Sequence, residues 1–156
     1  MPRRIFEIHR EIAIDRPPEA LFAKVTDFDR FGMLAARSDR VTITRLKGNG
    51  PPTAGHVWRI KGRALGRERQ GRVRITRMDH PHAIGFAGKG GGFEAETEVR
   101  VMTDGPGSRF SVTTVLSASG FKARLAAPYL KLRRSRIEGA MEKGLKRLKD
   151  WVESAD

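Results

Sequence analysis

Hydrophobic and polar residues alternate along the segment from Phe6 to Ile14. This two-residue period predicts a strand with one buried face. After Asp15, which can cap a helix, two prolines precede apolar residues at helical spacing, and this pattern predicts a helix. A second, short helix is expected at Asp29–Ala35.

Six further strands are predicted between residues 41 and 117, where extended apolar segments alternate with turn sequences. The expected strands are Val41–Lys47, Gly55–Arg63, Arg67–Met78, Ala83–Ala87, Phe93–Thr103 and Arg109–Ser117. Asp104–Gly107 is the clearest turn between them, and Gly88–Gly92 is expected to be a flexible one that could serve as a lid. One strand, then helices, then a run of strands and a final helix indicate an α+β antiparallel sheet rather than a parallel α/β fold.

The last and longest predicted element is a helix that begins within Phe121–Tyr129 and ends near Val152. Its apolar residues fall within a narrow arc at about 100° per residue. Pro128 either ends a short preceding helix or lies in the first turn of the long one. With no internal repeat and no long linker, residues 1–156 are expected to form a single domain.

The charge is strongly positive but local. The 156 residues include 31 Lys and Arg against 18 Asp and Glu, for a formal net charge of +13. Residues 59–77 contain eight basic residues and one acidic residue, and residues 121–156 contain ten basic and five acidic residues. Because 22 of the basic residues are Arg, genomic base composition explains the excess as readily as an anionic partner does.

Composition also narrows the function classes. The absence of cysteine excludes disulfides, a thiol nucleophile and a thiolate metal site. The start of the sequence has no apolar segment typical of a signal peptide, and no run of 18 apolar residues follows. We therefore expect a soluble, cytoplasmic protein.

Four segments resemble the START-related SRPBCC superfamily, and within it the polyketide cyclase/dehydratase and lipid-transport-like branch. They are the opening strand, Arg16–Phe22, Thr26–Phe28 and Gly120–Leu130. The resemblance implies a helix-grip fold, in which a curved seven-stranded antiparallel sheet wraps around a long C-terminal helix and encloses an apolar cavity. It also implies a hydrophobic ligand such as a lipid, polyketide or aromatic metabolite, but the fold alone does not fix the function.

Strand and helix periodicity select candidate residues for the wall of such a cavity. The candidates are Trp58, Ile60, Ile84, Phe86, Phe110 and Val112 on the strands, with Tyr129 and Met141 on the last helix. Each is equally well explained as ordinary core. Ala140 and Gly144 are expected on the inner arc of that helix, where they allow either close packing or room for a ligand.

Polar residues in apolar register are candidates for ligand recognition. Arg10 interrupts the apolar face of the first strand, and Arg134 lies near the apolar arc of the last helix. They could bind the carboxylate or phosphate head of a lipophilic ligand, or Arg10 could mark a β-bulge and Arg134 could extend to solvent. His56, on the same face as Trp58, is the weak candidate for a catalytic base, although a structural role explains it better because the spacing identifies no acidic partner.

Other chemistry has less support. Asp79, His80 and His82 form only a weak metal-binding pattern, because the two histidines one residue apart have no further ligands nearby in sequence. No metal is expected, and no other cofactor. Glu94, Glu96 and Glu98 share a strand face, and they are expected to form a solvated charge ladder with Arg72 and Arg74 on a neighbouring strand.

Three functions therefore compete. The first is binding or transport of a hydrophobic small molecule without chemistry. The second is a cyclase/dehydratase-like enzyme that uses the same cavity and one titratable side chain. The third is a basic surface that binds an anionic membrane or nucleic acid; nucleic acid is disfavoured because no aromatic residues interleave the basic segment after the first strand. The sequence does not indicate the ligand's identity or the oligomeric state.

Overall fold

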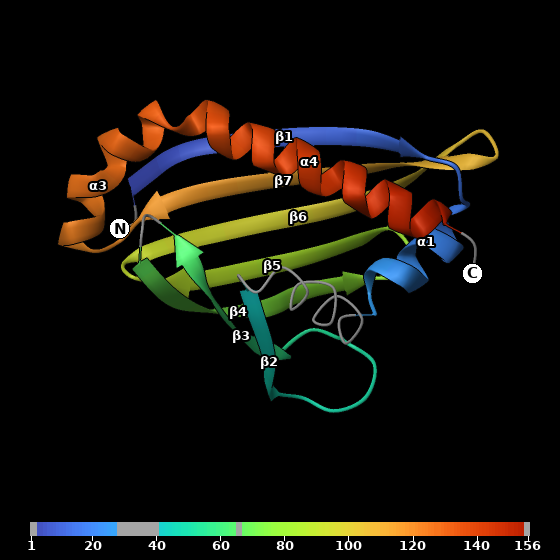
Figure 1. Ribbon diagram of the computed structural model, residues 1–156. Helices are drawn as coiled ribbons and strands as arrows, with labels where there is room; N and C mark the ends of the chain where they lie inside the picture. The colour runs from blue at the N-terminus through green and yellow to red at the C-terminus, as the bar shows by residue number, and fades with distance from the viewer. Residues whose placement is uncertain (1–2, 28–40, 65–66, 155–156) are drawn as a thin grey trace.

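A strongly curved antiparallel sheet forms the framework of the protein (Figure 1). The computed structural model describes residues 3–27, 41–64 and 67–154. The strands are β1 (Arg3–Ile14), β2 (Val41–Lys47), β3 (Val57–Ala64), β4 (Arg67–Asp79), β5 (Ala83–Gly90), β6 (Phe93–Asp104) and β7 (Gly107–Ala118), and the helices are α1 (Pro18–Val25), α3 (Phe121–Leu132) and α4 (Arg134–Glu153). The helix expected at Asp29–Ala35 lies outside the described residues.

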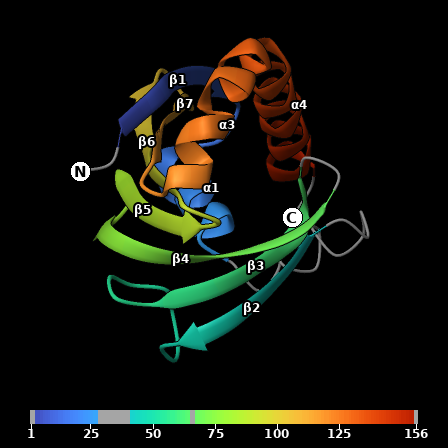
Figure 2. The same ribbon diagram turned by 90° about the vertical axis from the view of Figure 1, so that its left-hand side faces the viewer.

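The seven strands follow the order β1-β7-β6-β5-β4-β3-β2. Strands adjacent in sequence from β2 to β7 are neighbours in the sheet. The first strand, β1, pairs with β7 and forms the edge opposite β2. Figure 2 shows the sheet curving from β1 around to β2, with the helices on its concave side. The expected α+β helix-grip fold is confirmed.

The C-terminal helical region is divided at Arg133, where α3 ends and α4 begins. Both sequence-based alternatives for Pro128 were wrong, because this residue lies inside α3. Proline removes one backbone donor and strains the turn before it, but a helix can continue through it. The change of direction comes five residues later.

The helix α4 lies along β1 rather than at the middle of the concave face (Figures 1 and 2). Leu145 and Val152 are its buried residues. Ala140 and Gly144 are exposed, so the expectation that they face inward was wrong.

The glycine-rich segment Gly88–Gly92 is not all turn. Its first three residues belong to β5, and only Gly91 and Gly92, both at positive φ, form the connection to β6. A Cβ on Gly90 would lie 2.8 Å from the carbonyl oxygen of Gln70. Glycine is therefore required at position 90 because β4 and β5 approach closely. The glycine-rich composition of this segment is typical of a turn and so did not indicate a strand.

The core consists of two hydrophobic clusters, one at each end of α4. The first packs α1 and the end of α4 onto the strands through residues such as Phe22, Ile84 and Val152. The second packs α3 onto β1 and β7 through residues such as Ile8 and Leu130. Burial of these apolar side chains is the main force that holds the helices on the sheet.

The expected charge ladder has different partners from those predicted. Because β5 lies between β4 and β6, Arg72 and Arg74 do not neighbour the glutamates of β6. Instead, Glu94 pairs with Lys89 at 3.4 Å. Glu98 pairs with Arg100 at 2.8 Å and with Arg77 at 3.5 Å. These exposed pairs contribute little to stability.

Candidate functional site

An apolar hollow of about 250 Å³ lies on the concave face of the sheet. It is lined by one residue of α1 and eight residues of the strands: Val25, Ile43, Trp58, Ile60, Val73, Ile84, Phe86, Val99 and Phe110. All nine side chains are hydrophobic, so the hollow is suited to an apolar ligand held by shape and burial.

Strand register explains where this space comes from. Side chains alternate between the two faces, and cross-strand partners share a face. Ile60 lies opposite Gly71, and Val73 lies opposite Gly88. On their other side these residues face Ile43 and Trp58, so each has a glycine on one neighbouring strand only, and the missing side chains of Gly71 and Gly88 leave space on the concave face.

A second hollow, of about 460 Å³, continues from the first and shares Ile60 and Val73 with it. It extends toward the connection between β5 and β6, where Gly91 and Phe93 contribute to its lining. Its remaining lining includes four basic residues of β3, β4 and β5: Arg63, Arg69, Arg72 and Lys89. Only Arg69 shares the inward register of Val73, so the concave face changes from wholly apolar at one end to apolar with one basic residue at the other.

The structure brings together five of the nine residues chosen from the sequence as ligand-binding candidates. The five that line the apolar hollow are Trp58, Ile60, Ile84, Phe86 and Phe110. Val112 packs against the same core cluster without lining the hollow. The other three lie elsewhere: Met141 packs on the second cluster, and Tyr129 and Arg134 are exposed.

Sequence reasoning missed Val25, Ile43, Val73 and Val99 as lining residues. The alternation within β2 and β4 carried a signal for Ile43 and Val73, because each occupies an apolar position in its strand. Val25 had no such signal. Its place in the lining depends on how α1 docks against the sheet.

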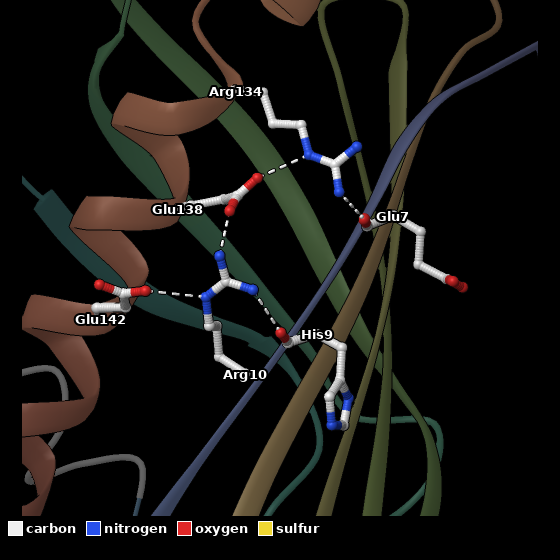
Figure 3. Close-up of polar contacts among 6 residues, drawn as sticks. All are labelled: Glu7, His9, Arg10, Arg134, Glu138 and Glu142. Carbon is white, nitrogen blue, oxygen red and sulfur yellow. Dashed lines mark hydrogen bonds and ion pairs between the residues drawn. The ribbon is translucent and has the colours of Figure 1, made fainter.

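Arg10 and Arg134 meet carboxylates of this chain (Figure 3). Arg10 donates a hydrogen bond from Nε to Glu142 at 3.0 Å and forms an ion pair with Glu138. Arg134 donates from Nε to Glu138 at 2.7 Å and from Nη2 to the backbone carbonyl of Glu7 at 3.0 Å. An anionic ligand would have to displace Glu138 to reach both guanidinium groups.

This polar junction joins β1 to α4 between the two hydrophobic clusters. The register of β1 on β7 is continuous at Arg10, so the alternative of a β-bulge there was wrong; the irregularity lies between Arg4 and Phe6. Hydrogen bonding from Arg134, aided by the charge of Arg10, lowers the pKa of Glu138 below its ordinary value. The carboxylate therefore stays ionised and holds both arginines.

His56 lies beside the apolar hollow but does not line it. Its ring is 6.0 Å from the ring of Trp58 and covers Gly48, where a Cβ would lie 2.3 Å from the imidazole. Its Nδ1 is buried and has no hydrogen-bond partner among the described residues. Among the residues that the structure describes, no carboxylate is hydrogen-bonded to the imidazole to orient it, as a general base normally requires.

Arg45 is a polar neighbour of the hollow that the sequence did not reveal. Its guanidinium carbon lies 5.1 Å from the ring centroid of Trp58, a cation–π geometry, and its Nη1 donates to the carbonyl of Gly50 at 2.9 Å. The Arg45 side chain thus connects the ring of Trp58 to the loop that follows β2.

No group of three or more potential metal-ligating side chains occurs in the part of the chain that the structure describes. His80, considered above with Asp79 and His82, packs its ring edge against Phe22 at a centroid distance of 4.9 Å. This histidine therefore contributes to packing around α1.

The sequence between residues 6 and 153 matches the family model described as polyketide cyclase/dehydrase and lipid transport. The chain belongs to this family. The match covers the sheet and all three described helices, in agreement with the resemblance inferred from the four short segments. A search of curated proteins with this sequence found no match.

Solved structures with the same fold are distant in sequence. Ara h 8.0201 has 15% identity and a TM-score of 0.72, with 96% of this chain and 99% of that chain covered. TTHA0849 from Thermus thermophilus has 19% identity and a TM-score of 0.73, with 94% and 97% covered. The Zhui aromatase/cyclase from a Streptomyces species has 14% identity and a TM-score of 0.70, with 95% and 93% covered. At these identities the likeness establishes the fold alone.

Proposed function

We propose that this protein binds a hydrophobic small molecule on the concave face of its sheet and acts as a carrier or binding protein. The observation that supports this most directly is the apolar hollow, in which none of the nine lining side chains is charged. Burial of an apolar ligand against such a wall is favourable at about 25 cal/mol per Å² removed from water. The lipid-transport part of the family description agrees with this proposal.

The dimensions of the two hollows suggest the size of the ligand. The apolar hollow, at about 250 Å³, is slightly below the range of about 300–1,000 Å³ typical of small-molecule sites. A single ring system suits it. A longer molecule would continue into the second hollow, where Arg69 could meet a polar or anionic end.

The lining favours binding over catalysis. A general acid or base must lie within hydrogen-bond reach of the reacting group, and none of the nine residues of the apolar hollow has a titratable side chain. His56 lies outside that lining. The polyketide cyclase alternative has the family description in its favour and would need a titratable group at the second hollow.

Native mass spectrometry of the purified protein, followed by organic extraction, tests the proposal. We expect a bound hydrophobic molecule, or stoichiometric binding when a neutral probe such as N-phenyl-1-naphthylamine is added. Val73→Phe should fill the junction of the two hollows and weaken probe binding at least about tenfold. Thr44→Phe places the same side chain at an exposed position of β2 and should leave binding unchanged.

The proposal fails if the protein binds no hydrophobic probe, or if Val73→Phe and Thr44→Phe have equal effects. Thermal unfolding of both variants separates loss of binding from loss of the fold. Turnover of a polyketide-type substrate that depends on an identified titratable residue would instead favour the enzyme.

A further inference from the structure

The outward face of α3 exposes four large hydrophobic side chains. Phe121 is 77% exposed, Leu125 67%, Tyr129 46% and Leu132 84%. Scattered exposed apolar residues are ordinary on protein surfaces, but a contiguous group indicates an interaction site. These four residues, called the α3 stripe below, are all within a single twelve-residue helix.

Helical periodicity places the stripe on one face. At about 100° per residue, the four side chains fall within an arc of about 80°. The buried residues Ala123, Ala127 and Leu130 point to the opposite side, where they pack on β1 and β7. Anchoring to the sheet therefore uses only one face of α3, and the packing of the helix does not account for the second apolar face.

Basic residues border the stripe on both sides. By the same periodicity, Lys122 and Arg133 lie along one flank, and Arg124 and Lys131 lie along the other. Between residues 121 and 137 the chain has six basic residues and no acidic residue. An apolar face between two cationic flanks is the pattern of a helix that lies in the interface of a membrane.

We propose that α3 docks the protein on an anionic lipid bilayer, with the α3 stripe inserted among the acyl chains and the flanking cations at the headgroups. The long basic side chains can place their charges at the phosphates while their stems follow the apolar surface. None of the described helices is long and apolar enough to span a membrane. The association is therefore peripheral.

Charge complementarity favours a bilayer over a second copy of the chain. A symmetric contact through the α3 stripe would bring the same cationic flanks together, and like charges would oppose it. Nucleic acid could pair with the basic residues, but it offers no comparable apolar medium for Leu125 and Leu132. An anionic membrane can interact with both parts of this surface, the α3 stripe through its acyl chains and the basic flanks through its headgroups.

The position of α3 adds a consequence for ligand exchange. The backbone N–H groups of Ser119 and Gly120 donate to the carbonyl of Gly92, which fixes the start of α3 beside the β5–β6 connection. The second hollow is lined by Gly91 and Phe93 at the same connection. Docking through α3 would thus bring this end of the concave face near the lipid, although the docking itself does not depend on the proposed ligand binding.

Flotation of the purified protein with vesicles tests the docking. We expect the protein to float with vesicles of phosphatidylcholine and phosphatidylglycerol at 7:3 and to stay at the bottom with phosphatidylcholine alone. Leu125→Ser combined with Leu132→Ser should reduce partitioning by about tenfold or more. Leu46→Ser combined with Met102→Ser removes exposed apolar side chains elsewhere and should leave partitioning unchanged.

The lack of cysteine allows a direct measure of insertion. Leu132→Cys, labelled with an environment-sensitive nitrobenzoxadiazole dye, should show a blue-shifted and brighter emission with the anionic vesicles. Met102→Cys, labelled in the same way, should not. Circular dichroism of each variant verifies the fold.

Three outcomes would overturn the proposal. They are failure to float with the anionic vesicles, flotation that the two serine substitutions on α3 do not weaken, and a dimer in light scattering that those substitutions dissociate. Flotation without probe binding would leave the docking intact and reject the carrier function, so the two proposals fail separately.

Discussion

Gly144 is an exposed glycine in the middle of α4, and replacing it with alanine should stabilise the protein. Glycine in a helix interior is less favourable than alanine by about 0.8–1 kcal/mol, because its backbone loses more freedom on folding. A Cβ added at Gly144 would meet no described atom within 4 Å. The full helix-propensity gain should therefore appear without a steric penalty.

We expect Gly144→Ala to raise the free energy of unfolding by about 1 kcal/mol, which corresponds to an increase in Tm of about 2–4 °C for a chain of this size. Gly139→Ala, also with open space around its Cβ, should have a similar effect. The two sites lie about 7.5 Å apart along the helix, so the double variant should gain about 2 kcal/mol.

Urea denaturation followed by circular dichroism measures these changes. The slope of the unfolding free energy against urea should stay constant while the midpoint rises. Binding of the neutral hydrophobic probe should not change, because Gly144 does not line either hollow. A destabilised Gly144→Ala variant, or one that binds the probe less tightly, would refute the placement of this residue at the surface.

Three further predictions concern packing and charge. Phe22→Ala removes a side chain that is 1% exposed and should destabilise the protein by about 3–5 kcal/mol in urea denaturation; a loss below about 1 kcal/mol would contradict its place in the core. Gly90→Ala would force a Cβ within 2.8 Å of the Gln70 carbonyl oxygen and should lower stability by about 1–3 kcal/mol, the opposite sign to Gly144→Ala. Because the folded state lowers the pKa of Glu138, its contribution to stability is present above the ordinary value of 4.5 and is lost as the pH falls through the lowered value. Glu138→Gln should therefore weaken the acid dependence of the unfolding free energy, and an identical pH profile would refute the assignment.

The order of the elements followed from sequence patterns. Alternation predicted the strands, helical spacing predicted α1 and the C-terminal region, and glycine or aspartate turns separated them. Such local periodicity is sufficient because each strand and helix must bury one face. The bounds were less accurate where composition was ambiguous, as in the extension of β5 through Gly90.

The candidate site was predictable only in part. Trp58, Ile60, Phe86 and Phe110 were identifiable because inward positions recur every second residue in a strand. Whether an inward residue lines a hollow or fills the core depends on what faces it across the sheet. That information comes from register, and register brings together residues such as Val73 and Gly88 that are not neighbours in sequence.

The sequence by itself determined the class of fold and the residues that can face inward, since both depend on short-range periodicity, and the resemblance of its segments to a known family indicated the family. Tertiary structure decided that Arg10 and Arg134 hold carboxylates of the same chain, because β1 and α4 lie far apart in sequence and meet only in the fold. It also decided that one apolar face of α3 is buried and the other exposed. Periodicity shows that a helix has apolar faces, but the docking of that helix on the sheet decides which face remains at the surface.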